Sequence, residues 1–368
     1  MLRKPISADS HITEPPNCYV DYIDPSRRDD APRIQRLESV GDAFVIPGMP
    51  SPVPLGLLAA AGKDPKDITT GGVAFDELWR GGWDSKFRLA DQDIDGVAAE
   101  LIYPTVGMLL CNHPDFDYKK ACFAAYNRWL AGYCAEAPER LIGLAQVSMR
   151  TPEDGVAELQ AAAAQGFKGV MMPGDPAVED YDSAVYDPVF AAAVELGLPL
   201  SFHILTTKSG SLAQNPRGPR INSFLSIIRG NQDIIGTLIF GGVFDRHPDL
   251  KIVCVEADAG WAPHYMYRMD HAYKRHRYWM KAPPLQRMPS EYFAEHIYIT
   301  FQDDWVAFKT RNLGNVRRLM WASDFPHSDS TWPNSQAVIE EQTAGLSQDQ
   351  RNWICHDNVA ELYGLTLN

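Results

Sequence analysis

The chain has 368 residues, of which 45% are hydrophobic and 22% charged, and its formal net charge at pH 7 is −13. These values match an ordinary globular protein and exclude a fibrous or largely disordered chain. The excess of acid argues against nucleic acid or an anionic membrane surface as the main partner, because both require basic patches. We therefore expect a small-molecule partner. The length favours a single barrel-type domain over residues 1–368.

The six cysteines form no CxxC pair and show no regular spacing, which is typical of reduced thiols. No apolar run approaches the roughly 18 residues that a membrane-spanning helix needs. A core-like strand begins too early to leave room for a signal peptide. These features predict a cytoplasmic protein.

Short apolar and β-branched runs recur along the chain, and each is followed by a segment with helical periodicity. The predicted strands end near Asp9, Tyr103, Val147, Met172, His203, Glu256, Phe301 and Asp324. The predicted helices between them include residues 118–136, 152–165, 187–196, 261–278 and 306–312. This alternation of strands and helices predicts a closed (β/α)8 TIM barrel rather than an open sheet.

Two long connections interrupt this pattern. Residues 21–84 are rich in Pro and Gly, contain the hairpin-like stretch RIQRLESVGDAFVIPG, and lie between the first and second predicted strands. We expect them to form an insertion over the barrel mouth. The second connection, residues 206–230, follows the fifth strand. Its basic residues either meet a substrate carboxylate or are solvated surface charges, and they are Lys208, Arg217, Arg220 and Arg229.

Polar side chains stand at the ends of several predicted strands, where barrel enzymes place their active sites. Asp9 and His11 alternate along the first strand and so face the same side. Each polar residue also has a structural interpretation: Asp9 as a turn cap, and His203 as a hydrogen-bonded core histidine. Glu256 and Asp324 are harder to explain in this way, because each follows an apolar run and requires a charge partner. One divalent metal ion would explain these placements together.

Three motifs carry a family resemblance: DSHITEPP at the start, GGVFDRHPDLKIVCVEADAGWAPHYMYRMD in the middle, and WASDFPHSD near the end. With them the chain resembles the amidohydrolase-related superfamily, in the branch of aminocarboxymuconate semialdehyde decarboxylase and γ-resorcylate decarboxylase. The resemblance implies a barrel with a catalytic divalent metal, zinc or manganese, bound by Asp9, His11, His203 and Asp324. It also implies that Asp324 acts as an acid or base, and that the protein is at least a dimer.

The chain departs from this branch at two positions. The muconate decarboxylases usually have histidine at the first position of the opening pair and on the sixth strand, where this chain has Asp9 and Glu256. The resulting set of acids and imidazoles is large enough for two ions, such as an iron, manganese or mixed Fe/Mn pair. Two of its members have structural alternatives, Glu14 as a salt-bridge partner and His327 as a hydrogen-bond partner of Asp324. The complete candidate metal-ligand set is Asp9, His11, Glu14, His203, Glu256, Asp324 and His327.

Three hypotheses for function follow. The first is a divalent-metal-dependent decarboxylase or hydrolase of a small carboxylated cyclic or unsaturated substrate, with Asp324, Glu256 and His327 as catalytic residues. The second is a dinuclear iron or manganese oxygenase on the same fold. The third is a non-catalytic subunit that partners an active paralogue. For the assembly we expect a homodimer or higher oligomer, with or without a paralogous subunit.

Overall fold

The predicted strands are present in the structure. The computed structural model describes residues 2–207 and 218–366. The parallel strands of the barrel are β1 (Ile6–His11), β5 (Ala99–Tyr103), β6 (Leu141–Gly143), β7 (Ala145–Gln146), β8 (Val170–Met172), β9 (Leu200–His203), β10 (Ile252–Val255), β11 (Ile297–Phe301) and β12 (Leu319–Trp321). Their pairing follows chain order, in one sheet of β1, β5 and β6 and a second that runs from β7 to β12.

The two sheets join into a ring at both of their ends. The predicted third strand is divided at Leu144, whose backbone N–H donates to Ile102 on β5 at 3.1 Å, whereas Ala145 donates to Gly169 beside β8 at 3.2 Å. At the other end, Asp324 N donates to Asp9 O at 3.0 Å and His11 N donates to Phe325 O at 2.7 Å. We call this junction of residues 7–11 with residues 321–325 the seam. The fold is therefore the predicted TIM barrel.

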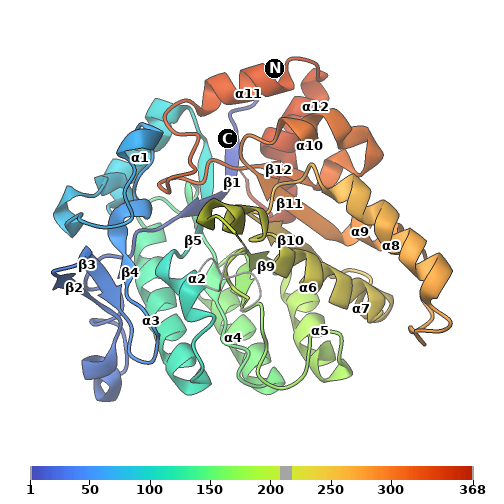
Figure 1. Ribbon diagram of the computed structural model, residues 1–368, viewed down its shortest axis with the longest axis horizontal. Coiled ribbons are helices and arrows are strands. Elements are labelled where there is room, and N and C mark those ends of the chain that lie inside the picture. The colour runs from blue at the N-terminus through green and yellow to red at the C-terminus, as the bar shows by residue number, and fades with distance from the viewer. Residues whose placement is uncertain (1, 208–217, 367–368) are drawn as a thin grey trace.

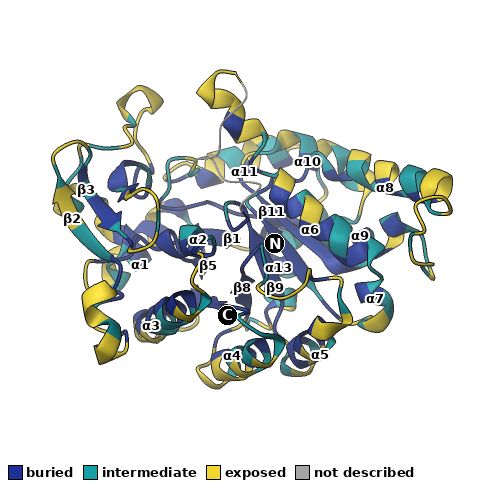
Figure 2. Cartoon of the chain, turned by 60° about the horizontal axis from the view of Figure 1, so that its bottom comes forward, coloured by how far each residue is buried: buried dark blue, intermediate teal, exposed yellow. Residues whose placement is uncertain are grey.

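Helices surround the ring of strands, and Figure 2 shows buried strands inside helices whose outer faces are exposed. Their ends follow local sequence signals: Thr151 caps α4 by accepting from Asp154 N, and Gly96 ends α1 with a φ of +69°. The helices are α1 (Ser85–Asp95), α2 (Val106–Leu110), α3 (Phe116–Cys134), α4 (Pro152–Ala164), α5 (Asp187–Leu196), α6 (Arg229–Phe240), α7 (Val243–Arg246), α8 (Ala262–His276), α9 (Pro289–His296), α10 (Trp305–Thr310), α11 (Ser335–Thr343), α12 (Gln348–Asn352) and α13 (Asn358–Leu362).

The insertion between β1 and β5 contains the predicted hairpin. Strands β2 (Arg33–Leu37) and β3 (Gly41–Val45) pair antiparallel, and β4 (Val53–Pro54) pairs with β3. This small sheet lies at the flank of the barrel beside α3 (Figure 1). Later parts of the insertion reach the barrel mouth, where Gly82 O accepts from Thr13 N at 2.8 Å and Ala61 N donates to Pro326 O at 3.0 Å.

The helices α1 to α13 show no membrane-spanning segment. Over residues 2–207 and 218–366, none of them combines the length with the apolar character that crossing a bilayer requires.

Candidate metal centre

Asp9 and His11 enter the barrel mouth from the end of β1. Both side chains are 0% exposed, and His11 Nε2 lies 3.4 Å from Asp9 Oδ1. His11 Nδ1 lies 2.9 Å from Pro104 O, and a carbonyl oxygen can only accept a hydrogen bond. Nδ1 therefore carries the proton of the neutral ring. The lone pair of Nε2 points into the mouth, as metal-binding histidines require.

His203 and Glu256 come from the ends of β9 and β10. His203 Nδ1 lies 3.0 Å from Ile204 O, so this ring also presents an unprotonated Nε2 to the mouth when it is neutral. That Nε2 lies 3.1 Å from Glu256 Oε2, 3.6 Å from Asp9 Oδ1 and 3.3 Å from His11 Nε2. Two lone pairs this close repel each other unless a proton or a cation lies between them.

Asp324 and His327 follow β12. Asp324 Oδ1 lies 3.4 Å from His11 Nε2 and 3.1 Å from His327 Nδ1. The hydroxyl of Thr105 donates its only proton to Ile12 O at 2.5 Å, so it can only accept from His327 Nε2 at 2.8 Å. His327 therefore carries its proton on Nε2 and turns the lone pair of Nδ1 toward Asp324.

Two of these acids have an uncommon backbone conformation. The φ angle is +55° at Glu256 and +54° at Asp324, in the left-handed region that non-glycine residues rarely adopt. Such residues cost free energy and are held in place by their surroundings, most often at functional sites. In this barrel the strained positions aim two carboxylates at the same point.

The carboxylates of the cluster lack ordinary partners. Both oxygens of Asp9, both of Asp324 and Oε2 of Glu256 are buried without a hydrogen-bond donor in the described part of the chain. A buried carboxylate without a donor or cation is costly. Oxygen and imidazole nitrogen together form a donor set that suits Mn²⁺, Fe²⁺ or Zn²⁺. The residues that are present therefore fit a divalent ion.

The pKa values of the cluster show how the protein neutralises this charge when no metal is bound. Burial opposes charge on the two imidazoles, but the neighbouring acids outweigh it and raise the pKa of His11 to about 9 and that of His203 to about 10. Burial also raises the pKa of Glu256, yet both imidazoles outweigh it and hold that pKa below its usual value. For Asp324, burial and the adjacent Glu256 raise the pKa well above the ordinary value. Protons thus occupy the positions that a cation would replace.

Six of the seven predicted ligands come together in the mouth. They form two groups in which the possible ligand atoms all lie within 4.8 Å of one another, and the groups share His11 and Glu256. The first group is Asp9, His11, His203 and Glu256, and the second is His11, Glu256, Asp324 and His327.

Glu14, the seventh predicted ligand, lies apart from these two groups. Its carboxylate accepts the backbone N–H groups of Thr105, Val106 and Gly107, each at 3.1 Å. These residues begin α2, whose first N–H groups have no partner within the helix. Glu14 therefore caps α2 and steadies the backbone of Thr105, the residue that orients His327.

Two basic residues of the connection after β9 lie in the described part of the chain and outside both groups. Arg220 and Arg229 are exposed. Lys208 and Arg217 lie outside the described residues.

Two contacts that hold the site in place were not predicted from the sequence. Arg88 on α1 is 0% exposed and bonds Glu100 on β5 at 2.5 Å, and Thr105 holds His327. Glu100 carried a usable signal, because an acid inside the apolar run VAAELIY must find a buried partner. Thr105 carried none, because a threonine after a strand is common.

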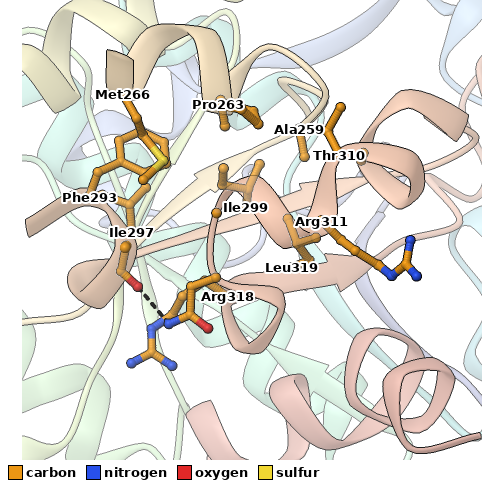
Figure 3. A pocket seen from close by; sticks show the side chains of 15 residues that line it. Ala259, Pro263, Met266, Phe293, Ile297, Ile299, Thr310, Arg311, Arg318 and Leu319 are labelled. Atoms are coloured by element: carbon orange, nitrogen blue, oxygen red, sulfur yellow. Dashed lines mark hydrogen bonds between the residues drawn. The ribbon is translucent and has the colours of Figure 1, made fainter. Parts of the chain in front are cut away.

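A separate pocket lies outside the ring of strands, between α8, α9 and α10 (Figure 3). Its lining includes Met266, Phe293, Ile297 and Leu319. The volume is about 30 Å³, far below the roughly 300–1,000 Å³ of pockets that bind organic ligands. No predicted site residue lines it, so we treat it as a packing void rather than a functional site.

The comparison with protein families places the chain. A family model described as amidohydrolase matches residues 56–365, and the chain therefore belongs to that family. The γ-resorcylate decarboxylase of Rhodococcus jostii is 26% identical over 272 residues, which cover 65% of this chain and 75% of the relative. The 2-amino-3-carboxymuconate-6-semialdehyde decarboxylase of Dictyostelium discoideum is 23% identical over 302 residues, 81% of each chain. The predicted branch is thus confirmed.

Solved structures agree on the fold. A crystal structure of an amidohydrolase from Mycobacterium avium subsp. paratuberculosis matches with a TM-score of 0.79 and 21% identity, over 99% of this chain and 100% of that chain. The 5-carboxyvanillate decarboxylase of Novosphingobium aromaticivorans, solved with bound manganese, matches with a TM-score of 0.71 and 20% identity, over 99% and 97%.

Proposed function

We propose that this member of the amidohydrolase family is a divalent-metal-dependent decarboxylase of a small carboxylated aromatic substrate. The observation that carries the proposal is the set of buried carboxylate oxygens without donors, which face two imidazole nitrogens in the barrel mouth. The choice of reaction is supported by the relatives, since both curated ones named above are decarboxylases. The aromatic substrate class is supported by γ-resorcylate and 5-carboxyvanillate in the names of two matched proteins.

The ion would be held by Asp9, His11, His203 and Glu256, with Asp324 and His327 at its open side. When bound, a divalent ion supplies Lewis acidity that draws electron density from the substrate carboxylate and a neighbouring oxygen. Manganese is the first metal to test, because it is bound in a matched decarboxylase structure.

Asp324 is the proposed proton donor. Burial and the nearby Glu256 carboxylate raise the pKa of Asp324 well above its ordinary value, which favours the protonated form. It delivers that proton to the ring carbon that bears the carboxylate. The carbon–carbon bond then breaks, its electron pair returns to the ring, and carbon dioxide leaves. Asp324 remains as a carboxylate and takes up a proton from solvent before the next turnover.

His327 orients this acid. Its Nε2–H donates to Thr105, so its Nδ1 can accept a hydrogen bond from the Asp324 carboxyl group until that proton passes to the substrate. A hydrogen bond of this kind fixes the carboxyl group in one orientation toward the substrate. Burial and the nearby His11 lower the pKa of His327, which keeps its ring neutral and able to accept.

The oxygenase, hydrolase and non-catalytic hypotheses each predict a different result in the test below. None of the four relatives described above is named an oxygenase. Hydrolysis would use the same ligands and is the nearest alternative chemistry. A non-catalytic subunit would bind metal without turnover.

The test is carbon dioxide release by the purified protein after loading with Mn²⁺, Zn²⁺ or Fe²⁺. The substrates are hydroxybenzoates, carboxyvanillate and carboxymuconates, and a chelated sample and Asp324→Asn are the controls. Metal-dependent release from one aromatic acid supports the proposal. No release from any of them contradicts it, and oxygen uptake with two ions per chain would favour the oxygenase hypothesis instead.

A further inference from the structure

The described strands of the ring lack a connecting β-ladder at two places, the third strand divided at Leu144 and the seam, and only at the divided strand does the chain itself continue across the break. The backbone connection at the seam is Asp324 N to Asp9 O and His11 N to Phe325 O. The register of β1 against β5 also shifts between Ser7 and Ser10, which marks a bulge. Three of the candidate ligands, Asp9, His11 and Asp324, thus stand on backbone that regular strand pairing does not hold.

A buried guanidinium group bridges this junction from outside the ring. Arg88 Nη1 donates to His11 O at 2.8 Å, and Nη2 donates to Phe325 O at 3.3 Å. The same group lies over the Phe325 ring, 4.6 Å from its centroid. Arg88 therefore bonds the backbone carbonyl of His11, a candidate ligand on β1, and that of Phe325, which follows the candidate ligand Asp324.

A buried polar network fixes the guanidinium group itself. Glu100 Oε2 accepts from Arg88 Nε at 2.5 Å and from Gln92 Nε2 at 2.7 Å. Glu100 Oε1 accepts from Ser10 Oγ at 3.2 Å, and Ser10 Oγ lies 3.1 Å from Ser323 Oγ. Ser323 directly precedes Asp324 in the chain. The network thus contacts both sides of the seam a second time.

Stability alone does not account for this arrangement. A buried ion pair loses so much hydration that apolar residues of similar volume are often as stable. The planar fork of arginine, by contrast, can hold two acceptors at a fixed separation, which neither an apolar side chain nor a lysine can do. The two acceptors here belong to strands that no ladder connects.

We propose that Arg88 is a positioning residue that holds the backbone of the β1 ligand His11 at a fixed distance from the segment after β12 and so determines metal affinity. This inference rests on the metal site of the proposed function. Partners that orient metal ligands typically change metal affinity by about 10- to 100-fold when they are removed, and we expect a loss of that size here.

The experiment compares Arg88→Met and Arg88→Lys with a matched control, Arg318→Met. Arg318 also donates to a backbone carbonyl, Glu295 O at 2.7 Å, and lies over an aromatic ring, Tyr298 at 4.6 Å. It directly precedes β12, at the end of that strand remote from the mouth, and Figure 3 shows it beside the outer pocket. Mn²⁺ affinity and stoichiometry are measured by equilibrium dialysis, the ligand environment by the electron paramagnetic resonance spectrum of bound Mn²⁺, and folding by circular dichroism without metal.

Both Arg88 variants should bind Mn²⁺ about 10- to 100-fold more weakly, with an altered spectrum. Arg318→Met should keep the affinity and the spectrum even if its thermal stability falls. If neither Arg88 variant folds, Glu100→Gln replaces them, because it keeps Arg88 and removes its anchor, and it should show a smaller loss of the same kind.

Unchanged affinity and spectrum in a folded Arg88 variant, or in Glu100→Gln where that variant stands in, would overturn the inference. An equal loss of Mn²⁺ affinity in Arg318→Met would also overturn the inference. So would the finding that the wild-type protein binds no divalent ion. The proposed function is judged separately. If the wild-type protein binds manganese but releases no carbon dioxide, only the proposed function is contradicted. If the wild-type protein releases carbon dioxide and the Arg88 variants bind manganese as tightly as it does, only the inference about Arg88 is contradicted.

Discussion

The seam and the opposite arc of the barrel, strands β8 to β11, bring candidate metal ligands to the same point by different means. In the arc, β9, β10 and β11 pair in an unbroken parallel register, and His203 and Glu256 stand at or just after the ends of two of them. At the seam, a bulge, a positive φ at Asp324 and a buried ion pair take the place of the ladder. In the arc the strand pairing is regular, and the positive φ at Glu256 comes just after β10 ends. At the seam the strand pairing itself is irregular, so the candidate ligands there depend on other contacts.

The largest expected effect is at the seam. Asp324→Asn keeps the size of the side chain but removes the acidic proton, so carbon dioxide release should fall by about 10²- to 10⁴-fold. Metal content should fall less, because Asp9, His11 and His203 remain. Turnover is measured together with bound metal, and Asp349→Asn, an exposed position on α12, is the control. Turnover equal to that of the unchanged protein would contradict the role of Asp324.

A change in the arc should affect stability instead of metal binding. Ile252 on β10 is fully buried and lies level with Ile297, which faces the outer pocket. Ile252→Ala should lower the free energy of unfolding by about 2–5 kcal/mol. Urea unfolding and Mn²⁺ dialysis measure the two quantities. A large loss of affinity in this variant would remove the distinction between arc and seam.

The variant Glu14→Gln tests whether Glu14, close to the seam, acts as a helix cap or as a metal ligand. The amide presents fewer acceptor sites to the three backbone N–H groups of α2, so we expect a loss of about 1–3 kcal/mol in stability. The number of bound ions per chain should not change. A lower metal stoichiometry would instead support Glu14 as a ligand.

The smallest expected effect is a pH dependence, which involves one imidazole from each region, His11 at the seam and His203 in the arc. The raised pKa values, about 9 for His11 and about 10 for His203, mean that both rings are protonated at neutral pH in the metal-free protein. Metal must displace these protons, so Mn²⁺ affinity should rise with pH by up to about tenfold per unit for each proton released. The stability of the metal-free protein changes with pH in the opposite direction, falling as pH rises. The contribution of each ring is fully present below the ordinary pKa of 6.5 and is lost as pH rises through its folded-state pKa.

Manganese titration and thermal unfolding of the metal-free protein over a pH series test these two slopes. Affinity that does not change with pH would contradict the assignment of both rings as ligands.

Much of the fold and the site could be predicted because it depends on local patterns. The strand endings at His203 and Asp324 follow from apolar runs that stop at polar residues, and a helix such as α4 follows from its capping residue and its period. The division of the third strand at Leu144 could not be predicted, since it depends on which neighbour each half pairs with. The contacts of Glu14 with the backbone of α2 could not be predicted either, because spacing alone cannot tell a carboxylate that binds metal from one that accepts backbone N–H groups.

The seam also bears on how the protein is made. Its serine contact joins Ser10 to Ser323, 313 positions apart in the chain. During synthesis β1 leaves the ribosome early, and its edge toward β12 stays unpaired until nearly all later strands have been added. Contacts of such long sequence separation form late in folding. The candidate metal site is therefore complete only after β12 has been made and has met β1.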